Sequence, residues 1–478
     1  DLQRAGNSVR HLLWAQALGL RGPLAQKVFA NVGVVHGVGV GGGSLVYAAV
    51  LLEPKASFYQ APAWRDLHSD WQRELAPHYQ RARQMLGASV NPYVGLQDDW
   101  LQQTAAQLGR ADSYGPVTQG IYFGAPDAAV DPFFAGKGPL RQGCSRCGNC
   151  ISGCAQGAKN SLDKNYLHLA RQLGVQVISE ARVSHLSRKG EDYHVHLQRR
   201  GMGAVVLRAP QVILAAGVLG TLEILFASRD RYRTLPTLPT AIGQHVRTNS
   251  EAIVGILGKP GVDISAGTTI SSHFYPDANT HITQNRFPRS YTFMRWYMGP
   301  LVDDPRPLRR AAKVLLRLLG QPWTTLRRWG ARQWQQRISV LTVMQQADNE
   351  LAFDYQRRFW RFGGFGLDSR LALGAASPTY LPQANAAARA FARVSGGDGL
   401  NVLAESLGNR AVTAHLLGGA VIAASPEAGV IDTRHQVFGH AGLFVIDGSS
   451  IPANVGVNPS LTITALAERA ISLWPVRG

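Results

Sequence analysis

The segment from residue 161 to residue 228 constrains the fold most, because its hydrophobic period changes from helical to strand-like and back. Residues 161–174 (SLDKNYLHLARQLG) carry apolar side chains at helical spacing, with Ser161 at the expected start and Gly174 at the expected end. Five short alternating or apolar stretches follow, each typical of a strand: VQVIS, ARVSHLSR, YHVHLQR, AVVLRA and QVILAAG. The next stretch, VLGTLEILFASR, is again helical. The sequence therefore predicts an α/β unit that contains a small antiparallel meander.

This order of elements is the layout of the second half of a flavoprotein fold built on two dinucleotide-binding motifs, and an unrelated α/β domain is the alternative. Towards the C-terminus, GLFVIDGSSIP predicts a strand and a turn, and NPSLTITALAERAISLW predicts a helix entered through Asn458-Pro459. Between residues 250 and 400, stretches such as EAIVGILG and RISVLTVMQQ alternate and are bounded by Gly and Pro. They predict an antiparallel sheet in a second domain.

A glycine-rich run at residues 36–47, HGVGVGGGSLVY, contains the pattern G-x-G-x-x-G from Gly37 to Gly42. A phosphate-binding fingerprint needs a helix after it and an acidic residue about 20 positions on, at the end of the next strand. The next acid, Glu53, is only 16 residues from Gly37, and the chain between Gly42 and Glu53 is too short for a crossover helix and a strand. The run is therefore not the fingerprint, although its bare backbone can still close on a flat ring or a phosphate.

Composition allows several cores and predicts an anionic partner. The chain has 478 residues, of which 45% are hydrophobic and 17% charged, enough for about two or three domains. Lys and Arg outnumber Asp and Glu by 49 to 31, and the net charge of +18 favours anionic surfaces. No nucleic-acid-binding motif accompanies this charge, so a nucleic-acid partner is not expected. No membrane-spanning run and no signal peptide are visible.

One segment concentrates the positive charge. Residues 306–337 contain basic residues and no acidic ones, and Leu308, Ala312, Leu315 and Leu319 form an apolar stripe at helical spacing. Two interpretations remain open: a helix pair that rests on anionic lipid, or a solvated basic face over a stripe packed into the core. The basic positions are 306, 309, 310, 313, 317, 327, 328, 332 and 337.

The four cysteines fall within one short run, CSRCGNCISGC. Cys144, Cys147, Cys150 and Cys154 have the C-x2-C-x2-C-x3-C spacing of ferredoxin ligands, with Ala155 where proline usually follows. An iron–sulfur cluster, a zinc site and four reduced thiols are the alternatives.

Several stretches together resemble the glucose-methanol-choline (GMC) flavin oxidoreductases, in particular their bacterial cholesterol oxidase-like branch. They are GVGVGGGSLVYAAVLLEP, GCAQGAKNSLDKNYL, VILAAGVLGTLEILFASR, LGGAVIAA and GLFVIDGSSIPANVGVNPSLTITALAER. The resemblance implies an α/β fold with an FAD/NAD(P)-binding Rossmann-like domain and an antiparallel-sheet, α+β substrate-binding domain. We expect the FAD-binding domain at residues 1–60, 160–255 and 405–478, and the substrate-binding domain with its Cys-rich loop at residues 61–159 and 256–404.

The resemblance also implies the site residues. His415 and Asn458 are the expected catalytic pair, which positions the substrate hydroxyl and accepts its proton. Leu416 stands where the family usually has proline, which loosens the backbone beside His415. The expected isomerising glutamate has two candidates, Glu350 and Glu405. The expected FAD contacts are Gly39, Gly41, Gly42, Gly43, Ser44, strand position 182 (Arg182, next to Val183), Ala216, Gly217, Asp447, Gly448, Asn458 and Pro459.

The function implied is FAD-dependent oxidation of a bulky secondary alcohol, a 3β-hydroxysteroid such as cholesterol, with O2 or an electron carrier as acceptor. The alternatives are a non-sterol alcohol dehydrogenase that uses an iron–sulfur cluster, and an inactive fragment without FAD. The family fingerprint is expected upstream of Asp1, so we expect an N-terminally truncated sequence that binds FAD weakly or not at all. The expected location is the cytoplasm or a membrane periphery.

Overall fold

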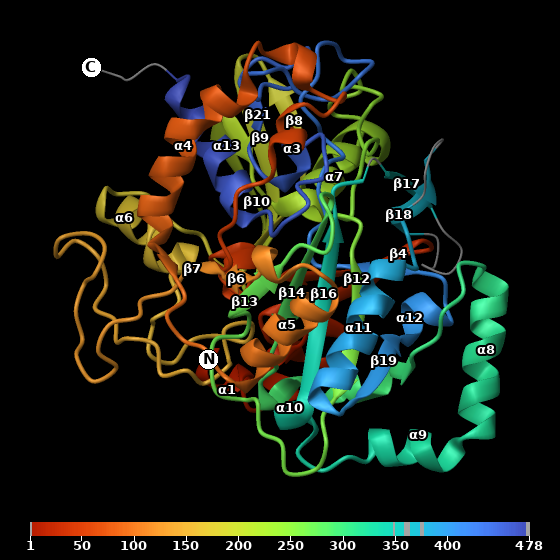
Figure 1. Ribbon diagram of the computed structural model, residues 1–478. Coiled ribbons are helices and arrows are strands. Elements are labelled where there is room, and N and C mark those ends of the chain that lie inside the picture. Colours follow the sequence, from red (N-terminus) through yellow and green to blue (C-terminus); the bar gives the residue numbers. More distant parts are fainter. Residues whose placement is uncertain (1, 348, 358–363, 373–376, 475–478) are drawn as a thin grey trace.

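A seven-stranded antiparallel sheet forms the centre of the computed structural model, which describes residues 2–347, 349–357, 364–372 and 377–474 (Figure 1). Its strand order is β15-β19-β12-β16-β14-β13-β6. This sheet confirms the antiparallel architecture expected for residues 250–400. The strands are β15 (Met298–Pro300), β19 (Asp398–Val402), β12 (Ala252–Leu257), β16 (Ile338–Gln345), β14 (Thr280–Asn285), β13 (Ser272–Phe274) and β6 (Gly115–Pro116).

Two helices, α5 (Leu96–Gln107) and α11 (Pro382–Ser395), pack on the central sheet and bury a common core with it. In α11 the buried side chains Ala384, Ala387, Ala388 and Phe391 recur every three or four residues. The small alanines allow the helix to lie close to the strands, and Phe391 stacks edge-on against Trp100 of α5.

The predicted α/β unit is present beside this sheet. The meander consists of β8 (Ala181–Lys189), β9 (Asp192–Arg199) and β10 (Gly203–Ala209), and β11 (Val212–Leu214) pairs in parallel with β21 (Leu443–Val445). Helix α7 (Gly217–Phe226) follows β11 as predicted, and a second small sheet has the order β20-β4-β3, from β20 (Ala411–Thr413), β4 (Val32–Gly37) and β3 (Leu24–Val28).

One strand prediction in this unit is wrong. The stretch VQVIS, residues 175–179, is irregular, and Val175 and Ile178 are exposed. No described segment pairs with this stretch, and an apolar run without a neighbouring strand cannot complete a ladder of backbone hydrogen bonds.

Some packing crosses the expected domain boundaries. Helix α4 (Trp71–Leu86), expected in the substrate-binding domain, buries its apolar face against α13 (Ser460–Ser472). The hairpin of β17 (Leu351–Arg357) and β18 (Phe365–Leu371) packs into the core around α7.

The remaining elements are short or lie at the edge of the molecule. Helices α8 (Pro307–Gly320) and α9 (Pro322–Trp329) confirm the predicted helix pair and lie at the lower right of Figure 1. None of the helices in the described ranges is long and apolar enough to cross a membrane. The others are α1 (Leu2–Ala5), α2 (Val9–Leu12), β1 (Trp14–Ala15), β2 (Leu20–Arg21), α3 (Ala56–Tyr59), β5 (Ala88–Val90), β7 (Thr118–Gly120), α6 (Tyr166–Gln172), α10 (Trp334–Arg337) and α12 (Leu403–Ser406).

Candidate active site

The glycine run forms a tight loop that leaves β4. Gly39, Gly41 and Gly42 have φ values of +138°, +113° and +56°, which side chains other than glycine rarely adopt. The loop passes into a short 3-10 turn, Gly42–Leu45, and not into a crossover helix, so the structure agrees that this is not the phosphate fingerprint. A methyl group built on Gly42 or Gly43 would meet no atom within 4 Å. Bare backbone is therefore open at this point.

Ser44 anchors the glycine loop. Its hydroxyl donates to the carbonyl of Gly41 at 2.7 Å and accepts from the backbone N–H of Leu162 at 2.9 Å. Ala216 and Gly217 form a second such opening where β11 turns into α7. Gly217 has a φ of +69°, and no atom lies within 4 Å of a Cβ built on it. Both places can receive a flat or anionic group against the main chain.

Asp447 is engaged inside the protein. Its carboxylate is buried and accepts hydrogen bonds from Thr221 Oγ1 of α7 at 2.6 Å and from the backbone N–H of Ser449 at 2.8 Å. Burial raises the pKa of this carboxyl above its ordinary value. The side chain thus ties the end of β21 to α7, and Gly448 begins the 3-10 turn that follows.

The structure brings the expected catalytic pair together from two loops. His415 follows β20, and Asn458 directly precedes Pro459, the N-cap residue of α13. Asn458 Nδ2 and His415 Nε2 are 3.4 Å apart. Asn458 is buried, and its Oδ1 has no hydrogen-bond partner within the described chain. An amide oxygen in this state can still take a ligand hydroxyl as a partner.

Glu251 completes the site, although it was not among the residues expected from the sequence. Its Oε1 contacts His415 Nδ1, and its Oε2 accepts from the backbone N–H of Ala414 at 2.9 Å. The side chain of Glu251 is only 2% exposed. We assign an N–H to Nδ1, facing this carboxylate, which makes Nε2, the nitrogen next to Asn458, the acceptor atom of the ring.

The residues just before Glu251 hold both catalytic loops. The Thr248 carbonyl accepts from Thr413 Oγ1 at 3.0 Å, next to His415. Asn249 Nδ2 donates to the Val457 carbonyl at 2.9 Å, next to Asn458. Asn249 and Ser250 have left-handed φ values of +58° and +48°. Such backbone conformations are costly outside glycine and persist where surrounding contacts enforce them, often at functional sites.

Nothing in the local sequence pointed to this arrangement. Glu251 is an ordinary polar residue at the start of an apolar strand, and it lies 164 residues from its partner His415.

At strand position 182, the side chain of Arg182 pairs with Glu223 of α7 at 2.8 Å, and Val183 packs against the core.

The cysteine loop lies against the chain that follows the glycine loop. Lys159 is buried and donates to the carbonyls of Leu45 and Cys150 at 2.8 and 2.7 Å, and burial lowers its pKa to about 8. Burial raises the pKa of Cys144 to about 12. Across the residues that the structure describes, no three His, Cys, Asp or Glu side chains are grouped so as to hold a metal ion. The iron–sulfur and zinc expectations therefore gain no support.

Neither candidate for an isomerising glutamate has a described bond to His415. Glu350 accepts from His245 Nδ1 at 2.9 Å and from Arg247 at 3.2 Å. Glu405 is buried, accepts from the backbone N–H of Ile253 at 3.3 Å, and lies close enough to Glu251 for their charges to interact.

Known proteins are similar to this chain in sequence and in fold. Residues 140–229 and 372–467 match sequence families described as GMC oxidoreductase. Cholesterol oxidase from Mycobacterium tuberculosis (strain CDC 1551 / Oshkosh) is 39% identical over 491 residues, covering 98% of this chain and 84% of that protein. Cholesterol oxidase from Acinetobacter baumannii is 35% identical over 501 residues, covering 100% of this chain and 88% of that protein.

A solved structure, pyridoxine 4-oxidase from Mesorbium loti, superposes with a TM-score of 0.62 over 96% of this chain and 90% of its own, at 15% identity. This likeness concerns the fold, whereas the relatives above share sequence along nearly the whole chain. The family match at residues 372–467 includes both His415 and Asn458. The chain therefore belongs to the GMC oxidoreductases, as an alcohol-oxidising enzyme with the FAD-binding fold of that family.

Proposed function

We propose that the protein oxidises a bulky secondary alcohol, a 3β-hydroxysteroid such as cholesterol, to the ketone with FAD as the hydride acceptor. The observation that carries this proposal is the contact chain from Glu251 through His415 to Asn458, which presents a basic nitrogen beside an amide. The choice of a sterol is supported by the two relatives named cholesterol oxidase.

The residues present fit a flavin. The open backbone at Gly42, Gly43 and Gly217 can lie against a planar ring or a phosphate without a steric clash from side chains. We propose that residues 39–44, 216–217, 447–448 and 458–459 hold the cofactor. When bound, FAD supplies the acceptor for the hydride that leaves the carbinol carbon.

The side chains supply the proton chemistry. The amide of Asn458 orients the substrate hydroxyl, and His415 Nε2 accepts the hydroxyl proton. The imidazole thereby becomes positively charged, and the buried carboxylate of Glu251 at Nδ1 stabilises that charge. Glu251 also fixes the ring orientation, so the proton acceptor is in place before the substrate binds.

The test is a turnover screen of sterols against sugars and short alcohols, following peroxide and reduction of an artificial acceptor in parallel. We expect sterols to be oxidised fastest. The ratio of the two signals distinguishes O2 from an electron carrier as the natural acceptor. Preferential oxidation of sugars or short alcohols would overturn the sterol assignment, and the absence of visible flavin absorbance from protein supplied with FAD would favour an inactive fragment.

His415→Ala tests the proposed base directly. Loss of a general base reduces rates by about 100-fold or more, so flavin reduction by the alcohol should slow by at least about 100-fold. The flavin absorbance of the purified variant serves as the control for cofactor binding. Near-normal reduction in a variant that retains flavin would remove His415 from the mechanism.

A further inference from the structure

We propose that residues 306–329, which we call the arm, dock the protein onto an anionic lipid bilayer. The arm consists of α8, α9 and the residues that begin and join them, and Figure 1 shows the two helices meeting at an angle along the edge of the molecule. The proposal concerns binding to a surface, so it does not depend on the identity of the substrate.

The apolar stripe of α8 faces solvent. Leu308 and Leu319 are 87% and 77% exposed, whereas Arg310 and Val314, on another face of the same helix, are buried. The alternative that the stripe packs into the core is therefore wrong for the described helix. On α9, Trp323 is 80% exposed and continues this apolar surface. An exposed apolar stripe on an amphipathic helix is typical of helices that lie in a membrane interface.

The other face of α8 is fixed to the protein. The Arg310 guanidinium donates to the carbonyls of Asp304 and Glu405 at 3.0 and 3.2 Å and to Asn409 Oδ1 at 3.0 Å. These contacts and buried Val314 occupy the inward face, so the outward leucines have no role in holding α8 in place. The stripe is thus displayed on a rigid element.

Basic side chains accompany the stripe. Among the cations of residues 306–337, Lys313 pairs with Asp304 at 2.7 Å and Arg328 with Asp398 at 3.3 Å. Among the described residues, the structure shows no ion pair for five exposed arginines of this segment: Arg306, Arg309, Arg317, Arg327 and Arg332. Arginines beside exposed leucine and tryptophan are the combination that binds anionic lipid headgroups.

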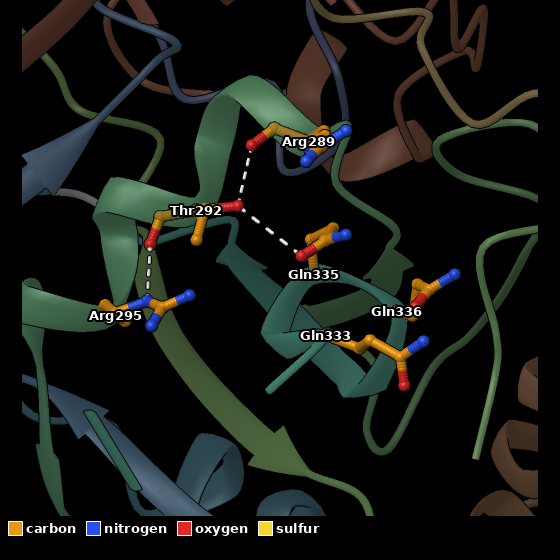
Figure 2. Close-up of a pocket in the computed structure, with 6 residues that line it drawn as sticks. All are labelled: Arg289, Thr292, Arg295, Gln333, Gln335 and Gln336. Atoms are coloured by element: carbon orange, nitrogen blue, oxygen red, sulfur yellow. Dashed lines mark hydrogen bonds between the residues drawn. The ribbon is translucent and has the colours of Figure 1, made fainter. Parts of the chain in front are cut away.

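A basic hollow adjoins the arm. Figure 2 shows Arg289, Thr292 and Arg295 on one side of this cavity of about 530 Å³ and three glutamines on the other: Gln333, Gln335 and Gln336. Arg295 also donates to the Trp329 carbonyl at 2.9 Å, which connects the hollow to α9. Two guanidinium groups with neutral amides are suited to a phosphate headgroup. One carboxylate, Asp263, accepts from Gln336 at 3.1 Å.

Charge favours a bilayer over a second copy of the chain as the occupant. Residues 306–337 carry no acidic residue, so a symmetric contact between two arms would bring unpaired cations face to face. An anionic bilayer neutralises the same cations and buries the same leucines. The net charge of +18 acts in the same direction.

The experiment is flotation of the full chain with vesicles of phosphatidylcholine alone or mixed with phosphatidylglycerol. We expect at least about tenfold stronger binding to the anionic vesicles at low salt, and weaker binding as salt increases. Arg309→Gln and Arg327→Gln should each weaken binding about fivefold. Leu319→Asp and Trp323→Asp should each weaken it by about tenfold or more.

The matched controls are Leu140→Asp and Lys137→Gln, which change an exposed leucine and a lysine away from the arm. They should bind like the wild type, and all variants should keep the wild-type melting temperature because the changed side chains are exposed. Equal loss of binding in the controls would overturn the proposal. So would equal binding to neutral vesicles, or a dimer in sedimentation experiments that only the arm variants dissociate.

Discussion

Two buried glutamates near the catalytic histidine have different surroundings. Glu251 faces His415 Nδ1 and a backbone N–H, which stabilise a negative charge. Glu405 accepts one backbone hydrogen bond and faces the charge of Glu251, and burial raises its pKa well above the ordinary range. Glu251 is therefore contacted on both carboxylate oxygens next to the histidine, whereas burial favours the protonated form of Glu405.

Replacing Glu251 by glutamine should slow flavin reduction by about 100-fold, because the amide keeps the shape but cannot stabilise the imidazolium charge. Stopped-flow reduction by the alcohol measures this, and its pH profile should differ from that of the wild type because the carboxylate next to the imidazole is lost. Glu405→Gln is the matched control, since it changes a buried glutamate that has no described bond to His415, and it should react within a few-fold of the wild type. Equal effects of the two changes would contradict the assignment of Glu251.

Glu405→Gln should also change the pH dependence of stability. A carboxyl whose pKa is raised in the folded protein stabilises the fold fully below its unfolded pKa, about 4.3, and this contribution is lost as the pH rises towards the folded value. The glutamine variant has no ionisable group at this position, so its stability does not fall in this way as the pH rises. Its melting temperature relative to the wild type should therefore increase as the pH rises above about 4.3. Parallel curves of melting temperature against pH for the wild type and the variant would show that Glu405 ionises normally in the folded protein.

At the scale of elements, Asp98 fixes helix α5 to the central sheet. Its carboxylate accepts from Arg286 at 2.9 Å and from Ser272 at 2.6 Å, and the side chains of Asp98 and Arg286 are 3% and 2% exposed. Removing one partner leaves a buried charge without compensation. We expect Asp98→Ala to lower the free energy of unfolding by about 3–5 kcal/mol, measured by urea denaturation.

A solvent-exposed ion pair provides the control for Asp98. Glu180 and Arg200 are 3.0 Å apart and 57% and 59% exposed, so Glu180→Ala should change the free energy of unfolding by less than about 1 kcal/mol. A similarly small effect of Asp98→Ala would show that the buried pair is not required for the packing of α5.

The spacing of apolar residues predicted which segments form helices better than it predicted which side of each helix is buried. The repeat of leucines identified α8 as a helix, but the inward face is set by Arg310, which bonds to carbonyl and amide groups of Asp304, Glu405 and Asn409. Two of these residues are almost 100 positions away, and no local pattern reports them. VQVIS has the composition of a strand, yet strand formation depends on a neighbour that the stretch itself does not encode.

At the scale of the whole molecule, the sequence predicted only those site residues that lie in recognisable motifs. His415 and Asn458 lie in stretches that resemble a family, and the fold brings them to 3.4 Å. Glu251 and Asn249 act through contacts with chain 164 to 208 residues away, so only the folded structure reveals them. The same applies to the domain boundaries, because α4 packs on α13 across nearly the length of the chain.

The proposed FAD contacts come from segments that are distant in sequence, so FAD should stabilise the whole molecule. A ligand that binds only the folded state adds about 2.7 kcal/mol to the free energy of unfolding at 100 times its Kd. The melting temperature should therefore rise with added FAD and fall when FAD is removed, as thermal unfolding followed by fluorescence can measure.

Gly43→Ala should reduce this rise and leave the apoprotein unchanged, because a methyl group at Gly43 meets no atom within 4 Å. Gly320→Ala, equally open but on α8, is the control and should keep the full rise. A melting temperature independent of FAD, or an equal rise in both variants, would contradict the cofactor role of the glycine loop.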